Sequence, residues 1–285
     1  MRKLLDGFGL LEAARWYPHY GLLFSDMTKG GVYRYRGATH PLDVLIAHRK
    51  GIGGLVAHAD GGLVVAGRNV AHKADDGRTT VLMETASDEM FFNDLTADGR
   101  GRLYVGSVGS GSSPNEEPAE RERSPGRLYR LDLDGTRTTL SDDVLVSNGL
   151  GVSPADDALY HVDSHRHVVW AFNEGGERKV FVDVKEYDGV PDGLAVAADG
   201  SVWVAMAGGG LVVGWAAGGH RIAEYAVPHP LVTSVCFGGP RLTSLYVMTG
   251  VNTEYPSDEG GAVRVMDDER SGLPAPICAV RVPYA

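Results

Sequence analysis

Four side chains with oxygen donors recur at one phase of a repeated pattern in this 285-residue chain. They are Glu12, Asn93, Asn148 and Asp192, and each lies ten or eleven residues before the first apolar residue of a strand-like segment. If these positions converge, the two carboxylates need a counter-charge, because burying an unpaired charge is costly. A divalent cation supplies that charge. Carboxylate and carboxamide oxygens favour Ca²⁺, Mg²⁺ or Mn²⁺ over thiolate-seeking metals.

The spacing of these residues follows an internal repeat. Its second strand occurs six times, in the segments GLLFSD, GLVVAG, RLYVGS, ALYHVD, SVWVAM and SLYVMT. The first apolar residues of these segments are 41, 40, 56, 43 and 43 residues apart, which is the size of a propeller blade. No long amphipathic helix competes with this pattern. The sequence therefore predicts an all-β fold, a single six-bladed β-propeller over residues 1–285 with four-stranded antiparallel blades around a central channel.

The step of 56 residues contains an insertion at residues 109–126, GSGSSPNEEPAERERSPG. Its Ser, Pro and charged residues cannot build a core, so we expect an exposed loop. Two interpretations stay open. The loop is either a tolerated surface insertion or a lid over one face of the molecule.

The shared phase of the four side chains has a structural meaning in a propeller. The first strand of each blade lines the channel, so equivalent positions from different blades converge on its axis. In the two remaining repeats this position holds Gly53 and the region of Thr233.

A competing interpretation is that Asn148-Gly and Asp192-Gly form hairpin turns. However, the repeats carry their turns about five residues later, in segments such as SPADDA and AADGS. A second turn so close would leave no room for a strand, which favours the cation site.

Composition excludes several classes of partner. The formal net charge is −10 and no Lys/Arg-rich run is present, so we expect no nucleic acid partner. No segment approaches the roughly 20 apolar residues that span a bilayer, and the N-terminus does not resemble a secretory signal. Cys236 and Cys278 lie in apolar strand-like segments. We expect two buried thiols in a reducing cytoplasm, with a single bridge as the alternative.

The chain resembles the regucalcin/gluconolactonase-like family, which includes luciferin-regenerating enzymes and sugar-acid lactonases. The resemblance covers nearly the whole chain. It rests on five motifs in family order: LLEAARW followed by LLFSD, FFNDLTADGRGRLYVG, SNGLGVSPADDALYHVDS, PDGLAVAADGSVWVA and VTSVCFGGPRLTSLYVMTG.

The resemblance implies one divalent ion at the channel mouth, held by Glu12, Asn148 and Asp192. In the family, the residue that matches Asn93 contacts the ion, its water or the substrate. Lactonases of this family often carry an Arg two residues before that Asn, where this chain has Phe91. An apolar ring cannot donate hydrogen bonds to a polyol, so we expect a lactone or ester less polar than gluconolactone. The alternative is that Phe91 packs in the core.

The predicted activity is hydrolysis of a small-molecule lactone or ester. The cation, Ca²⁺ first with Mg²⁺, Mn²⁺, Zn²⁺ or Fe²⁺ as alternatives, polarises the carbonyl, and Asp192 accepts a proton from the attacking water. Asn93 orients the carbonyl or the water, and Phe91, Asn93 and Thr233 are the predicted substrate contacts. Two alternatives stay open: a phosphotriesterase-like hydrolase and a non-catalytic cation- or metabolite-binding propeller.

Three histidines in HVDSHRHVVW stand outside this scheme. His165 and His167 alternate and would share one face of a strand, while His161 lies on the preceding strand. We interpret all three as core or surface residues. Asp94 and Asp163 are interpreted as supporting or turn residues rather than catalysts. The sequence does not predict an oligomeric state.

Overall fold

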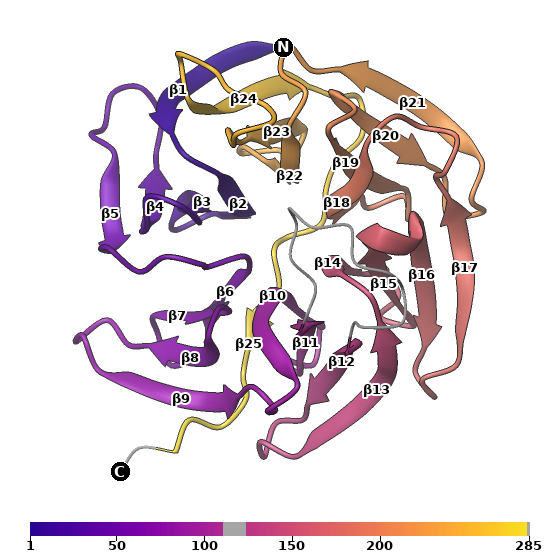
Figure 1. The fold of residues 1–285 in the computed structure, drawn as a ribbon. Coiled ribbons are helices and arrows are strands. Elements are labelled where there is room, and N and C mark those ends of the chain that lie inside the picture. Colours follow the sequence, from indigo (N-terminus) through magenta and orange to yellow (C-terminus); the bar gives the residue numbers. More distant parts are fainter. Residues whose placement is uncertain (111–123, 284–285) are drawn as a thin grey trace.

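The computed structural model describes residues 1–110 and 124–283. Apart from one 3₁₀ turn, the regular elements of this part are β-strands, arranged in six sheets around a central axis (Figure 1). The predicted six-bladed β-propeller is confirmed. The predicted loop insertion at residues 109–126 falls mainly on residues 111–123, which lie outside the described residues.

Four blades consist of consecutive strands, innermost first. They are blade 1 (β2 Leu11–Tyr17, β3 Gly21–Asp26, β4 Val32–Tyr35, β5 Asp43–Ile46), blade 3 (β10 Glu89–Ala97, β11 Leu103–Gly109, β12 Gly126–Leu131, β13 Arg137–Val144), blade 4 (β14 Ser147–Val152, β15 Ala158–Asp163, β16 Val168–Asn173, β17 Arg178–Asp183) and blade 5 (β18 Val190–Val196, β19 Val202–Ala207, β20 Leu211–Trp215, β21 Arg221–Ala226).

The two ends of the chain complete the other blades. Blade 6 contains β22 (Val232–Gly238), β23 (Ser244–Thr249) and β24 (Gly261–Asp267), and its outer strand is β1 (Arg2–Phe8), antiparallel to β24. Blade 2 contains β6 (Leu55–His58), β7 (Leu63–Val65), β8 (Asn69–Lys73) and β9 (Thr79–Glu84). A fifth strand, β25 (Ile277–Cys278), pairs in parallel with β6. Both additions join segments that are far apart in sequence, and the repeat pattern did not predict them.

The core of the molecule lies between the blades. Among the described residues the buried apolar side chains form six clusters, and each cluster joins two neighbouring blades. Both cysteines belong to these clusters as free buried thiols, Cys236 between blades 6 and 1 and Cys278 between blades 2 and 3. The alternative of a disulfide is therefore wrong. Because every blade packs on two others, the inner strands are held in a fixed ring.

The six inner strands close that ring around the channel. β2 packs against β22 and β6, and β10, β14 and β18 continue the contacts between them around the axis. All six begin at the same end of the channel, since each is the first strand of its blade. Residues at equal phase therefore lie at the same depth in the channel.

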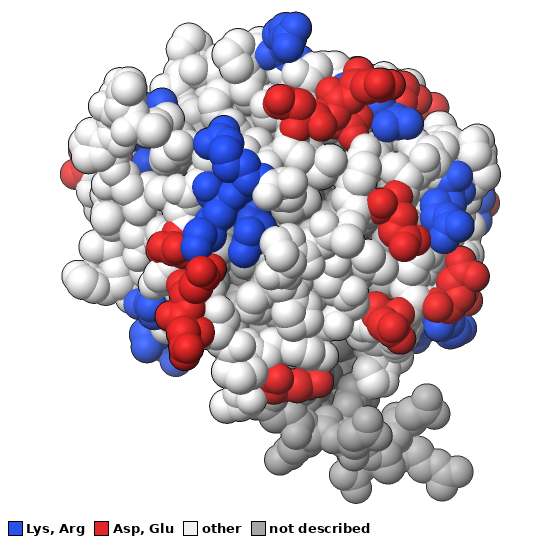
Figure 2. All heavy atoms as spheres, turned by 90° about the horizontal axis from the view of Figure 1, so that it is seen from above, with Lys and Arg blue, Asp and Glu red and all other residues white. Residues whose placement is uncertain are grey.

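The outer surface carries charges of both signs. On the face shown in Figure 2, basic and acidic side chains form small groups separated by uncharged surface. Within the described part of the chain, no helix has the length and apolar character to cross a bilayer.

Candidate cation site in the channel

A β-bulge recurs in the inner strands at the phase of the predicted site residues. The register shifts between Glu12 and Arg15 in β2, and at the corresponding place in four further inner strands: between Phe92 and Leu95 in β10, Ser147 and Leu150 in β14, Pro191 and Leu194 in β18, and Val232 and Ser234 in β22. A bulge breaks the alternation of a strand and re-aims a side chain. Asn93, Asn148, Asp192 and Thr233 lie within these breaks, whereas Glu12 lies at the upstream edge of the break in β2.

The carboxylates of Glu12 and Asp192 come from the inner strands of blades 1 and 5 and act on each other electrostatically. Blade 6 separates their blades, so the two groups can meet only across the axis. Burial raises the pKa of Glu12 well above its usual value, and Asp192 and Asp94 raise it further. Burial also raises the pKa of Asp192, followed by the repulsion of Asp94. The structure therefore brings these predicted residues together.

The two Asn side chains donate hydrogen bonds to the protein through their amide nitrogens. Asn93 Nδ2 donates to the carbonyl oxygen of Ser147 at 2.9 Å. Asn148 Nδ2 donates to Ser164 Oγ at 3.2 Å, and that hydroxyl donates to the carbonyl oxygen of Pro191 at 2.6 Å. Each amide nitrogen therefore has a partner in the protein, while neither side-chain oxygen accepts a hydrogen bond from a described residue.

Asp192 provides a direct test of whether a cation fits here. Its Oδ1 is buried and has no hydrogen-bond partner among the described residues. No described residue donates a hydrogen bond to the Glu12 carboxylate either. A buried carboxylate oxygen without a donor is costly, and a cation removes that cost. Two carboxylates and two amide oxygens are hard donors, so the residues present fit a divalent ion such as Ca²⁺.

The donor set depends on its amides. Within residues 1–110 and 124–283, no group of three or more His, Cys, Asp or Glu side chains is arranged to hold a metal ion. The predicted set contains only two carboxylates and is completed by Asn93 and Asn148.

Glycines allow the inner strands to approach one another closely at this level. A Cβ on Gly149 would lie 2.6 Å from the carbonyl oxygen of Asp192, and one on Gly193 would lie 2.8 Å from that of Thr233. A side chain on Gly53 would collide with Oδ1 of Asn93. The second repeat therefore contributes space for the Asn93 amide rather than a ligand.

Two buried charged residues lie beside the predicted set: Asp94, which was interpreted as a supporting or turn residue, and Arg15, which was not predicted. Asp94 accepts hydrogen bonds from the backbone N–H groups of Leu95 at 2.7 Å and Leu150 at 3.1 Å. Arg15 Nη2 lies 3.6 Å from Asp94 Oδ1, and both side chains are over nine-tenths buried. Burial raises the pKa of Asp94, while Arg15 and the two backbone donors oppose that shift. The available signal was an Arg inside the otherwise apolar segment that follows Glu12.

The predicted substrate contacts have different surroundings. Phe91 is half-buried and pairs with Val108 in β11, whereas Phe92 is fully buried in the core between blades 2 and 3. The Thr233 hydroxyl is buried and donates to the carbonyl oxygen of Leu11 at 2.5 Å. Roles for Phe91 and Thr233 in substrate binding stay predictions.

The expected strand placement of His165 and His167 is wrong. A 3₁₀ turn, Ser164–Arg166, contains His165, and His167 follows it with a φ of 56°. The Asp163 side chain accepts from the backbone of Arg166 and caps this turn, which breaks the alternation.

His161 lies in the core behind the site. It is fully buried, and its Nε2 is 2.8 Å from Ser147 Oγ. Ser147 in turn accepts the hydrogen bond of the Asn93 amide. His161 therefore supports the strand that orients Asn93 and does not face the channel carboxylates.

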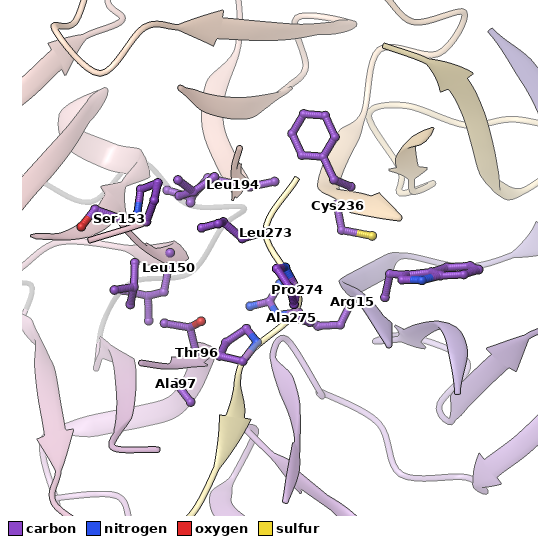
Figure 3. Close-up of a pocket in the computed structure, with 18 of the residues that line it drawn as sticks. Arg15, Thr96, Ala97, Leu150, Ser153, Leu194, Cys236, Leu273, Pro274 and Ala275 are labelled. Atoms are coloured by element: carbon purple, nitrogen blue, oxygen red, sulfur yellow. The ribbon is translucent and has the colours of Figure 1, made fainter. Parts of the chain in front are cut away.

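A separate cavity of about 310 Å³ lies at the other end of the channel. Its walls are formed by the downstream ends of inner strands, including Leu150 and Leu194, and the segment 273–276 passes over it (Figure 3). Arg15 lies on its wall, between the cavity and the carboxylates. Because the bulged residues stand near the strand starts, this cavity is not the carboxylate site.

Comparison with known proteins identifies the family. Residues 10–251 match the SMP-30/Gluconolactonase/LRE-like region, and the chain belongs to this family. A pentonolactonase, XacC, of Haloferax volcanii is 31% identical over 280 residues, covering 92% of each chain. A regucalcin of Xenopus laevis is 31% identical over 248 residues, covering 83% of this chain and 81% of that protein.

The solved structures agree on the fold. A calcium-binding protein, regucalcin, from Agrobacterium tumefaciens superposes with a TM-score of 0.83 at 22% identity, covering 99% of this chain and 98% of that one.

Proposed function

We propose that this chain is a divalent-cation-dependent hydrolase that opens a lactone or related cyclic ester. Membership of the family supports the class of reaction, as does the similarity to a pentonolactonase over 92% of both chains. The observation that carries the proposal is the buried Oδ1 of Asp192, which has no hydrogen-bond partner among the described residues. The ion is proposed to be Ca²⁺, because every donor is an oxygen.

The residues that would hold the ion are Glu12, Asn93, Asn148 and Asp192. When bound, a divalent cation supplies Lewis-acid polarisation of the substrate carbonyl and stabilises the charge that develops on its oxygen. Asp192 has two carboxylate oxygens, so one can face the ion while the other accepts a proton from the attacking water. The Asn93 amide, fixed through Ser147, orients the carbonyl or the water.

The substrate is proposed to be less polar than gluconolactone. Phe91 is half-buried at the start of β10, two residues before Asn93, and it offers an aromatic ring without hydrogen-bond donors. A polyol chain placed against this ring would lose hydrogen bonds to water without replacing them. The Thr233 hydroxyl, on blade 6, is the proposed polar contact on another side of the channel.

The test is acid release from a panel of lactones by protein stripped with a chelator and then reloaded with one ion at a time. The panel should run from alkyl lactones to gluconolactone and include a phosphotriester. We expect hydrolysis that disappears with the chelator and returns best with Ca²⁺, on the alkyl lactones. Cation binding without turnover on any substrate would favour the non-catalytic binding protein, and turnover confined to the phosphotriester would replace the lactonase proposal.

A further inference from the structure

Three buried carboxylates act on one another in the channel. Glu12 comes from blade 1, Asp94 from blade 3 and Asp192 from blade 5, so alternate blades each contribute one. The backbone N–H of Leu150 donates to Asp94 Oδ2, and the adjacent Gly149 packs against the carbonyl oxygen of Asp192, so the strands that carry these two carboxylates are linked through β14. The charges of Asp94 and Asp192 also raise the pKa of Glu12. Because water is largely excluded from all three, their charges are poorly screened from one another and from anything bound among them.

Arg15 supplies the positive charge inside this group. Among the described residues, it forms an ion pair with Asp94, with 3.6 Å between Nη2 and Oδ1, whereas no ion pair with a basic side chain is formed by Glu12 or Asp192. Its guanidinium cannot move freely, because Nη1 donates to the carbonyl oxygen of Ala14 and Nη2 to that of Leu95, both at 2.9 Å. Asp94 is fixed as well, by the two backbone N–H groups of Leu95 and Leu150.

The charges therefore form a fixed set. Three carboxylates against one guanidinium leave two uncompensated negative charges, which match one divalent cation. Without Arg15 the third carboxylate would be unpaired, and a trivalent cation would match the site instead. The bulge between Glu12 and Arg15 separates the two residues along β2, so Arg15 acts from deeper in the channel without occupying the ligand positions.

We propose that Arg15 is a specificity-determining residue that sets the charge of the cation this site accepts. It acts by offsetting the charge of Asp94, and it is not itself a ligand. This inference rests on the proposed cation site, but it does not depend on which substrate is hydrolysed.

The experiment compares Ca²⁺ and Tb³⁺ binding to the purified full chain, with calorimetry for Ca²⁺ and luminescence for Tb³⁺. Removing a positive charge helps a trivalent ion more than a divalent one, so Arg15→Met should raise the ratio of Tb³⁺ to Ca²⁺ affinity by about tenfold or more. Neither affinity should fall. A purely structural Arg15 gives the opposite result, with both ions weakened in equal proportion and the ratio unchanged, and that result overturns the inference.

Further variants separate charge from folding. Arg15→Lys keeps the charge and should keep the wild-type ratio, and Asp94→Asn should lower the ratio because it removes a negative charge. The double variant Arg15→Met/Asp94→Asn restores the net charge and should return the ratio to near its wild-type value. If the Arg15→Met protein does not fold, Asp94→Asn alone tests the inference. An unchanged ratio of Tb³⁺ to Ca²⁺ affinity in the Asp94→Asn protein would contradict the charge argument.

A matched control breaks a different buried ion pair. Arg102 pairs with the buried Asp98 at the turn after β10, away from the site, so Arg102→Met should leave the ratio unchanged.

Loss of binding in Asp192→Asn confirms that the measured ion is in the channel. If the wild type binds neither ion, both the cation site and the role of Arg15 are overturned. If it binds Ca²⁺ but hydrolyses no lactone, only the proposed reaction fails.

Discussion

Asp192 is the residue on which the proposed chemistry depends most. Asp192→Asn keeps the shape of the side chain but removes the charge and the proton acceptor. We expect lactone turnover to fall by at least about a hundredfold, the range for loss of a general base, while the chain remains folded. Initial rates with excess Ca²⁺ and urea unfolding of the same preparation measure turnover and stability, and the fall in turnover includes the loss of this Ca²⁺ ligand.

The matched control for that variant is Asp98→Asn. Asp98 is also buried, but its carboxylate is paired with Arg102, whereas Asp192 Oδ1 has no hydrogen-bond partner among the described residues. It should lose stability without a selective loss of turnover. Equal losses of activity in both variants would contradict the assignment of Asp192.

Phe91 tests the polarity of the substrate. Phe91→Arg places hydrogen-bond donors at the start of β10, where the native ring has none. We expect kcat/KM for gluconolactone to rise relative to an alkyl lactone, by about tenfold for one or two new hydrogen bonds. Phe91→Leu is the control, since it keeps an apolar side chain. A ratio that does not change in Phe91→Arg would mean that Phe91 serves only in packing.

His161 predicts how stability depends on pH. Burial lowers its pKa from 6.5 to about 4; Asp163 and Asp143 favour the protonated ring and Arg178 opposes it. The unfolded chain therefore takes up this proton first. The stability that the neutral His161 ring contributes is fully present above pH 6.5. As the pH falls toward 4, the free energy of unfolding decreases by roughly 3 kcal/mol.

Urea midpoints at pH 7, 5.5 and 4.5 measure this loss. His161→Gln should be less stable at pH 7 but show a shallower decline on acidification. His40→Gln, at an exposed position, should decline as the wild type does. The same slope in His161→Gln and the wild type would contradict the prediction.

At the scale of the elements, the bulged inner strands position the site, and their close approach depends on glycine. Gly149→Ala would place a Cβ 2.5 Å from the backbone nitrogen of Leu194 and 2.6 Å from the carbonyl oxygen of Asp192. Relief of that overlap requires β14 and β18 to move apart. We expect a loss of about 1–3 kcal/mol of stability together with weaker Ca²⁺ binding, because Asp192 moves with its strand.

Gly218→Ala is the control for this substitution. An added Cβ there meets nothing nearer than the His220 ring at 3.8 Å. Urea unfolding and calorimetric Ca²⁺ titration should leave it close to the wild type. A Gly149→Ala protein that loses stability but keeps full Ca²⁺ affinity would contradict the prediction, because cation binding would then not depend on the spacing of these strands.

The sequence predicted the elements that repeat and missed those that occur once. Apolar strand segments at a steady spacing predicted the blades, and the shared phase predicted that Glu12 and Asp192 meet. β1 was missed because it is a mostly exposed outer strand, and β25 because two residues carry no periodicity. A bulge has no residue signature of its own. The Arg15–Asp94 pair joins residues from different blades, so the single Arg in an apolar segment marked one partner without indicating the other.

At the scale of the whole molecule, the ring is closed where β1 joins blade 6. Phe8 packs edge-on against Phe24 and Tyr33 of blade 1, with ring centroids 5.4 and 5.3 Å apart. Phe8→Ala should therefore loosen the junction of blades 6 and 1 and cost about 3–5 kcal/mol. Urea unfolding measures this, and Met90→Ala, which shortens an exposed side chain, is the control. A midpoint equal to that of the wild type would show that the junction does not limit stability.

The same junction has a consequence for how the protein is made. β1 is synthesised before its partner β24, which spans Gly261–Asp267. The nascent polypeptide must therefore carry an unpaired strand edge until β24 has been made, which invites wrong pairing with other chains. Arg2, Lys3 and Asp6 give this waiting edge charges of both signs, the kind of side chain that discourages such aggregation.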